Sequence, residues 1–277
     1  MTAPALSELA ERIRESDPDR FEAALFVGDE ALREHLFALY VYNLELAKIP
    51  WAVSEPMIGL MRLQWWRDTV EEAAAGAPPK AHEVAGPLMR AIQATAMDIA
   101  PLLEMATHRE RELEPEPLAD TDAVLAYVDG TVGAVMKAGA SLLAGADEPT
   151  QSAAKRVGRA HGIASLLTAV PAHAQVGRVM LPSVPEDRSR LVAGETPPAL
   201  RDTAQQLSRL GTKALREARR QPGASEAHPA FLSAWRTGVI LRDAMRPDVD
   251  LFAPIGQESP FRRRARLLWL GFSGRMP

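Results

Sequence analysis

Apolar residues recur every three or four positions along almost the whole chain, which is the spacing of amphipathic helices. Over residues 30–47 they form a wide stripe, and Asp29 stands where a helix N-cap is expected. Pro50 should end this helix, and Pro56 suits the first turn of the next one, which runs to about Gly76. The same pattern predicts further helices, at residues 84–112, 120–144, 150–170, 198–219 and 229–246.

Segments rich in proline, glycine and acidic residues separate the predicted helices, as loops do. They lie at residues 76–80, 113–119, 145–149, 182–198 and 221–229. No alternation of period two persists, and the sequence contains no repeat and no glycine-rich nucleotide-binding loop. We therefore expect one all-α domain over residues 1–258, followed by a basic amphipathic tail over residues 259–277.

Composition narrows the possible functions. The chain has no cysteine, which excludes disulfides, thiol nucleophiles and thiolate metal sites. The net charge is −4, but residues 262–277 hold five arginines and no acid, so the other residues carry 27 basic and 36 acidic groups, a net charge of −9. This balance argues against a nucleic-acid-binding protein. The N-terminal residues resemble neither a signal nor a transit peptide, so we expect a cytoplasmic protein that at most attaches to a membrane surface.

The predicted tail combines arginines with large apolar residues in the run FRRRARLLWLGF, residues 261–272. One interpretation is an interfacial segment, in which arginines meet anionic lipid and aromatic rings lie at the headgroup boundary. The other is a helix that packs on the domain and exposes its arginines. The membrane-contact candidates are Arg262, Arg263, Arg264, Arg266 and Trp269.

Few residues indicate chemistry by their spacing alone. Asp68 and Glu72 share a helix face and could grip a divalent ion, although a solvated face is the commoner explanation of such a pair. His108 and Glu112 lie in a charged run that we expect to be solvated. His173 follows Pro171 at a predicted helix end and lacks an evident catalytic partner. We therefore assign no catalytic residue and no metal ligand.

Three segments, in order, resemble the squalene/phytoene synthase family. The first runs from DPDRFEAALF to AKIPWAVSEP, the second is YVDGTVGAVMKAG, and the third is VGRAHGIASLLTAVPAHAQVGRVMLP. Together they span about residues 17–182. The resemblance implies the all-α isoprenoid synthase fold for the whole domain.

The family's chemistry, as the resemblance implies it, depends on two aspartate-rich motifs whose carboxylates hold Mg²⁺ ions on the diphosphate of a prenyl donor. At the acidic positions of the first motif this chain has Ala47, Lys48 and Trp51. At those of the second it has Ala169 and His173. Loss of the metal clamp costs at least several kcal/mol of transition-state stabilisation, or about 10³-fold in rate. We therefore do not expect head-to-head prenyl condensation, and we expect no cofactor.

One branch of the family is more similar than the rest. The run YNLELAKIPWAVSEPMIGLMRLQWW resembles the branch of complex I (NADH dehydrogenase) assembly factor 6, which also has a Pro-x-His like Pro171-Ala172-His173. The resemblance implies a catalytically silent protein that acts on a complex I subunit or assembly intermediate. The absence of a transit peptide suits a bacterial relative, at the cytoplasmic face of the inner membrane.

Two alternatives accompany this interpretation. A divergent prenyl-diphosphate transferase would use other acids, such as Glu45, Asp68 and Glu72, and would need Mg²⁺. A binding module would hold an isoprenoid, quinone or lipid in the former prenyl cavity. The ligand-pocket candidates are Glu45, Lys48, Arg62, Gln64, Arg67, His173 and Arg178.

Overall fold

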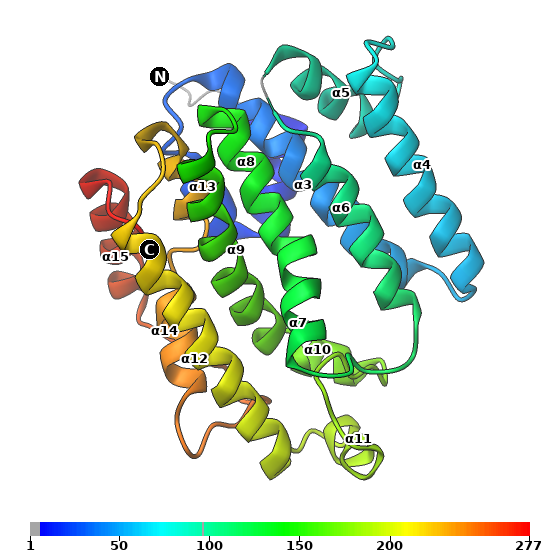
Figure 1. Cartoon of the computed structure of the whole chain (residues 1–277), viewed down its shortest axis with the longest axis vertical. Helices are drawn as coiled ribbons and strands as arrows, with labels where there is room; N and C mark the ends of the chain where they lie inside the picture. Colours follow the sequence, from blue (N-terminus) through cyan, green and yellow to red (C-terminus); the bar gives the residue numbers. More distant parts are fainter. Residues whose placement is uncertain (1–5, 96) are drawn as a thin grey trace.

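The computed structural model describes residues 6–95 and 97–277, and within these ranges the chain forms helices and no strand (Figure 1). The predicted all-α fold is therefore confirmed. The long helices run side by side along the longest dimension of the molecule (Figure 1).

The first half of the chain packs around a central helix, α3, which contacts α1, α4, α5, α6 and α8. Its side chains Leu36, Leu39, Tyr40 and Tyr42 are fully buried in the core of this half. The elements of this half are α1 (Glu8–Ser16), α2 (Pro18–Ala24), α3 (Glu30–Ala52), α4 (Pro56–Ala74), α5 (Ala85–Ala94), α6 (Ala100–Arg109), the 3-10 turn η1 (Glu110–Leu113), α7 (Thr121–Val128), the π-helical turn η2 (Asp129–Gly133) and α8 (Ala134–Ala144).

In the second half, α9 is the central helix and packs against both α8 and α12. Its residues Ile163 and Leu167 share a core with Leu207 of α12 and Leu241 of α14. The elements are α9 (Glu148–Thr168), α10 (Val170–Gln175), α11 (Pro185–Val192), α12 (Pro198–Arg220), the 3-10 turn η3 (Ser225–Ala227), α13 (His228–Leu232), α14 (Thr237–Ala244) and α15 (Pro260–Ser273).

Several predicted boundaries were wrong. Pro50 does not end α3, which continues to Ala52, because a proline so close to a helix end disturbs only the last turn. The predicted helix 84–112 is broken between α5 and α6, where the Thr95 hydroxyl donates to Ala91 O and the Asp98 carboxylate accepts from Ala100 N. Such side-chain bonds compete with helical ones. The predicted helix 229–246 is likewise broken, and the predicted loop 182–198 contains α11.

The segment YVDGTVGAVMKAG forms the junction of α7, η2 and α8, and it lies directly against α9. The contact is close because both sides carry glycine. A Cβ atom on Gly158 of α9 would lie 2.6 Å from the Cα atom of Gly133. Beside this contact, Arg159 of α9 forms a paired hydrogen bond to the Asp129 carboxylate, with 2.9 Å between Nε and Oδ1. The glycines therefore allow two backbones to meet that larger residues would separate.

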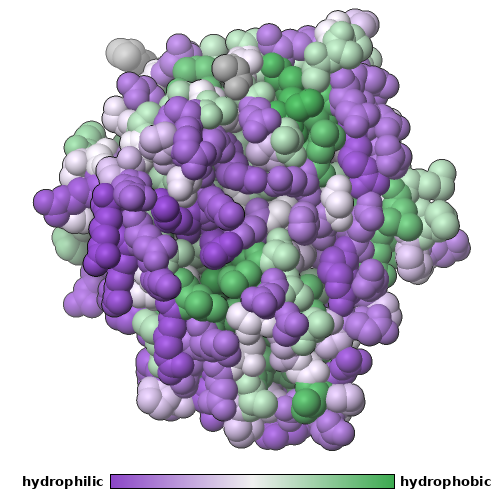
Figure 2. All heavy atoms as spheres, in the orientation of Figure 1, coloured by the Kyte–Doolittle hydropathy of each residue, from purple (hydrophilic) through white to green (hydrophobic). Residues whose placement is uncertain are grey.

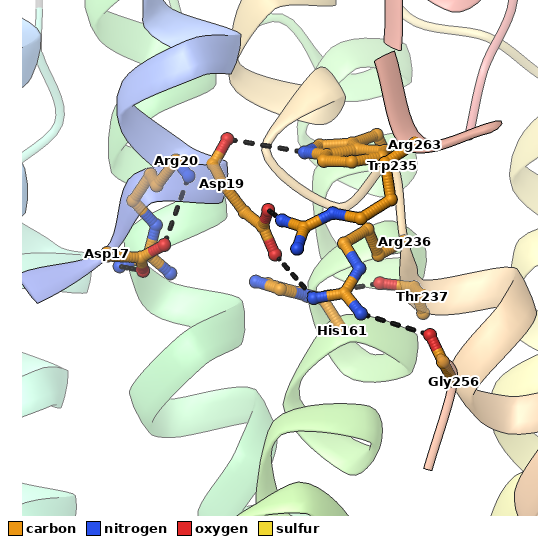
Figure 3. A network of polar contacts seen from close by, with 9 residues as sticks. All are labelled: Asp17, Asp19, Arg20, His161, Trp235, Arg236, Thr237, Gly256 and Arg263. Atoms are coloured by element: carbon orange, nitrogen blue, oxygen red, sulfur yellow. Dashed lines mark hydrogen bonds and ion pairs between the residues drawn. The ribbon is translucent and has the colours of Figure 1, made fainter. Parts of the chain in front are cut away.

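The last helix, α15, is tied to the first part of the chain through Asp19 of α2 (Figure 3). The Asp19 carboxylate accepts from Arg236 Nη1 at 2.9 Å and from Arg263 Nη2 at 2.6 Å. Its backbone carbonyl accepts from Trp235 Nε1 at 3.3 Å. Helix α15 also buries Leu267 and Leu270 in a small apolar cluster with Trp235. Residues 260–273 thus form a helix that packs on the domain.

Candidate functional site

The positions that correspond to the two aspartate motifs meet in space, at the C-terminal end of α3 and on α10. Trp51 stacks on His173, with 5.4 Å between the ring centroids and 26° between the planes. The guanidinium of Arg178 lies 5.6 Å from the centre of the Trp51 ring. An aromatic ring, an imidazole and a guanidinium therefore occupy the space where the family resemblance places carboxylates.

Arg178 holds this contact together through its hydrogen bonds. Its Nη2 donates to the carbonyl of Pro50 at 2.6 Å, and its Nη1 donates to the carbonyl of Glu112 at 3.2 Å. The Pro50 carbonyl is one of the last four of α3, which have no partner within the helix. A cation at that end also interacts favourably with the helix dipole. Arg178 thus closes the C-terminal end of α3 against η1.

A buried polar group lies behind Arg178. The carboxylate of Glu112, which is 4% exposed, accepts a hydrogen bond from Tyr127 at 2.7 Å and forms an ion pair with Arg109. Burial raises the pKa of Tyr127, so its hydroxyl stays protonated and donates. The prediction that Glu112 belongs to a solvated run was wrong, because Arg109, at i−3 on the same face, and Tyr127 compensate its charge.

The surroundings of His173 favour its neutral form. Burial lowers its pKa, against the opposing effect of Glu112, and Arg178 lowers it further. The cavity beside it is lined by apolar side chains such as Leu166 and Leu181 and has a volume of about 10 Å³. That is about the space of one water molecule. A prenyl chain can enter at this point only if side chains move.

A second and larger cavity, of about 420 Å³, lies between α3 and α4. It brings together three of the ligand-pocket candidates, Glu45, Lys48 and Arg62, beside Trp65 and His82. The Glu45 carboxylate is already compensated, because it pairs with Arg12 of α1 and lies 3.5 Å from Lys48 Nζ. The sequence pattern gave no indication of Arg12. The chemistry of this groove is thus mixed in charge and partly aromatic.

Gln64 and Arg67 lie apart from both cavities. Arg67 forms an ion pair with Glu110, with 2.5 Å between Nη1 and Oε1, and its Nε donates to Gln64. Gln64 in turn donates to Asp68 at 2.6 Å. The structure therefore distributes the pocket candidates over three places: the α3–α4 groove, the contact of Trp51 with His173, and the pair of α4 with η1.

The acids of the enzyme alternative do not converge. Asp68 accepts from Gln64, Glu72 pairs with Lys80 at 2.7 Å, and Glu45 pairs with Arg12. Within the described ranges, no group of three or more histidine, aspartate and glutamate side chains is arranged to hold a metal ion. The residues present thus do not fit the two-sided Mg²⁺ clamp that the family resemblance implies.

The membrane-contact candidates on α15 differ in their surroundings. Arg263 pairs with Asp19, and Arg266 pairs with Glu258 at 2.6 Å. Arg262 and Arg264 are exposed, and Trp269 is 54% exposed. In the described part of the chain, no helix is both long and apolar enough to span a bilayer.

Comparison with known proteins agrees with this architecture. The solved structure of a dehydrosqualene synthase superposes with a TM-score of 0.72 at 15% identity, over 96% of this chain and 94% of that one. Squalene synthase HpnC from Alicyclobacillus acidocaldarius superposes with a TM-score of 0.68 at 17% identity, over 85% of this chain and 91% of that one. These likenesses confirm the predicted helical isoprenoid-synthase type of fold.

Sequence comparison adds the family to the fold that the solved structures indicate. This chain is 28% identical to NADH dehydrogenase (ubiquinone) complex I, assembly factor 6, of Homo sapiens, over 90% of this chain and 76% of that protein. The Bos taurus protein of the same name is 29% identical, over 88% and 75%. The family profile described as squalene/phytoene synthase matches residues 13–268. The chain therefore belongs to the squalene/phytoene synthase family.

Proposed function

We propose that this protein assists the assembly of respiratory complex I and does not catalyse prenyl transfer. The observation that carries the proposal is the stacking of Trp51 on His173, at two positions where the family resemblance places metal-binding carboxylates, with Arg178 against the same ring. The assembly role is supported by the similarity to relatives named complex I assembly factor 6.

Prenyl transfer depends on stabilisation of the leaving group. A diphosphate that departs from a prenyl chain develops negative charge, which divalent ions stabilise by several kcal/mol. Lys48 and Arg62 of the α3–α4 groove could attract a diphosphate, but Glu45, 3.5 Å from Lys48 Nζ, already offsets part of this positive charge. Two single cations on one side of the groove do not replace divalent ions that are held from both sides of a site. The rate of ionisation would therefore be lower by about 10³-fold or more.

The partner in this proposal is a complex I subunit or assembly intermediate, met at the cytoplasmic face of the inner membrane. A peripheral location is supported by α15, where Phe261 and Phe272 are 81% and 82% exposed. An isoprenoid, quinone or lipid ligand, if one is bound, fits the α3–α4 groove of about 420 Å³ better than the cavity of about 10 Å³ beside His173.

Deletion of the gene tests the assembly role. Membranes from the deletion strain should oxidise NADH through complex I more slowly than wild-type membranes and should contain less assembled complex on native gels. Succinate oxidation, which bypasses complex I, should be unchanged. Complementation with wild-type protein should restore complex I. Normal complex I activity in the deletion strain would overturn the proposal.

Catalytic silence needs its own experiment. The purified protein is incubated with Mg²⁺ and farnesyl or geranylgeranyl diphosphate, and released diphosphate is measured. We expect release at the background rate. Release that requires the protein and is lost in Asp68→Ala would instead support the divergent transferase, and this result would leave the assembly role to be judged by the deletion strain.

A further inference from the structure

A cavity of about 600 Å³ lies where α12, α14 and α15 meet, and it shares no lining residue with the cavities described above. Four arginines line it: Arg219 of α12, Arg242 of α14, Arg266 of α15 and Arg275 just after α15. None of the described residues that line it is an aspartate or glutamate. The charged side chains that line the cavity are therefore all cationic.

The arginine charges are only partly compensated. Arg266 pairs with Glu258, and Arg219 Nε donates to the main-chain O atom of Pro277, the last residue, at 2.9 Å. Arg275 lies over the ring of Trp269, 5.0 Å from its centre. Within the described ranges, Arg242 and Arg275 have no carboxylate partner. Repulsion among these guanidinium groups opposes their convergence, and a bound anion would relieve it.

The position of Arg219 shows the same crowding. Burial lowers its pKa, and the neighbouring charges of Arg216 and Arg242 lower it further. Figure 2 shows the corresponding surface: hydrophilic residues crowd the part of this face that lies over α12 and the C-terminal end of the chain. A pocket of this size and charge suits the headgroup of a phosphate-containing molecule.

Helix α15, which forms one wall of the cavity, indicates where such a phosphate comes from. Trp269 lines the cavity and is 54% exposed. Outside the cavity lining, Leu268 and Phe272, one helical turn apart on the same helix, are 49% and 82% exposed. Phe272 is held against the domain by an edge contact with Phe26, with 5.6 Å between the ring centroids. Exposed aromatic and aliphatic side chains beside clustered arginines match the chemistry of an anionic lipid surface.

We propose that the cavity binds the phosphate group of an anionic phospholipid while Leu268, Trp269 and Phe272 enter the interfacial region of the bilayer. The four arginines supply the charge and the tryptophans Trp235 and Trp269 supply the apolar wall. This inference deepens the membrane part of the proposed function and rests on it.

Vesicle sedimentation with the full-length protein tests the inference. The protein is mixed with vesicles of phosphatidylcholine alone, or of phosphatidylcholine with about one third phosphatidylglycerol. We expect binding only to the vesicles that contain phosphatidylglycerol. The double variant Arg242→Gln/Arg275→Gln should bind them about 30-fold more weakly, at roughly fivefold for each basic residue near the surface. Leu268→Ser/Phe272→Ser should also weaken binding, because it removes apolar area from the interface.

A matched control separates the cavity from overall charge. Arg90→Gln/Arg209→Gln removes the same charge from two exposed arginines that do not line the cavity. We expect this variant to lose no more than about threefold in binding. Circular dichroism confirms that each variant is folded.

Two outcomes would overturn the inference. Equal losses in the two glutamine variants would mean that net charge alone attracts the protein. Failure of the wild-type protein to bind either kind of vesicle would also overturn the inference. If calorimetry then detected binding of inorganic phosphate, the site would bind a free phosphate instead. If the wild-type protein does not bind vesicles but restores complex I in the deletion strain, only this inference is overturned. If it binds vesicles as expected but does not restore complex I, only the assembly role is overturned.

Discussion

Replacing Arg178 with alanine should reduce the free energy of unfolding by about 2–3 kcal/mol. The side chain makes two charge-assisted hydrogen bonds, to the carbonyls of Pro50 and Glu112, and covers the ring of Trp51. Hydrogen bonds to charged groups contribute about 1.5–3 kcal/mol each, and the cation–π contact and helix dipole add roughly 1 kcal/mol. Arg178 is half-buried, so water replaces part of the lost interactions in the variant. We therefore expect the free energy of unfolding to fall by about half of the summed contributions.

Urea unfolding, followed by tryptophan fluorescence, measures this loss directly. Arg90→Ala is the control, because Arg90 is exposed, and it should cost less than about 0.5 kcal/mol. Arg178→Lys keeps the charge but replaces the two donor nitrogens, which reach two separate carbonyls, by one, so it should recover about half of the stability. A loss below about 1 kcal/mol in Arg178→Ala, or full recovery by lysine, would refute the view that the bidentate contact holds α3 against η1.

Three further predictions concern other parts of the fold. Burial lowers the pKa of His161 to about 4, so as the pH falls the unfolded chain takes up a proton at this histidine before the folded chain does. The contribution of His161 to the free energy of unfolding is therefore full above about pH 6.5 and falls by about 2 kcal/mol by pH 5. Urea unfolding at both pH values should show a smaller fall in His161→Gln. Gly158→Ala places a Cβ atom 2.6 Å from the Cα of Gly133, so the thermal midpoint should drop by roughly 5 °C, and an unchanged midpoint would contradict the close contact. Asp19→Asn leaves two arginines without their charge partner, so trypsin should cleave α15 faster than in wild type, and equal cleavage rates would show that α15 is held by its apolar cluster instead.

Helical periodicity was sufficient to predict the long helices, because one face of each is apolar over several turns. It missed α1, α2 and α11, which are too short for a periodic signal to build up. It also missed the break between α5 and α6. There the helix is interrupted by the side-chain hydrogen bonds of Thr95 and Asp98, which the pattern of apolar positions does not indicate.

The candidate site was only partly predictable. The family resemblance marked Trp51 and His173 as occupants of former carboxylate positions, but their mutual stacking depends on two segments that lie far apart in the sequence. The hydrogen bond from Arg178 to Pro50, for example, spans 128 positions. Glu112 looked solvated because charged residues surround it in sequence. Its burial depends on the hydrogen bond from Tyr127, which lies on another helix, α7.

The three contacts of Asp19 also have a consequence for synthesis of the protein. Its partners Trp235, Arg236 and Arg263 follow it by 216, 217 and 244 residues. At a translation rate of about 5–20 residues per second, Asp19 leaves the ribosome roughly 10–50 s before Arg263 does. The Asp19 carboxylate of α2 therefore stays in water until nearly the whole chain has been made. A nascent chain that is released early lacks these partners, so α2 cannot make its contacts with Trp235, Arg236 and Arg263 in it.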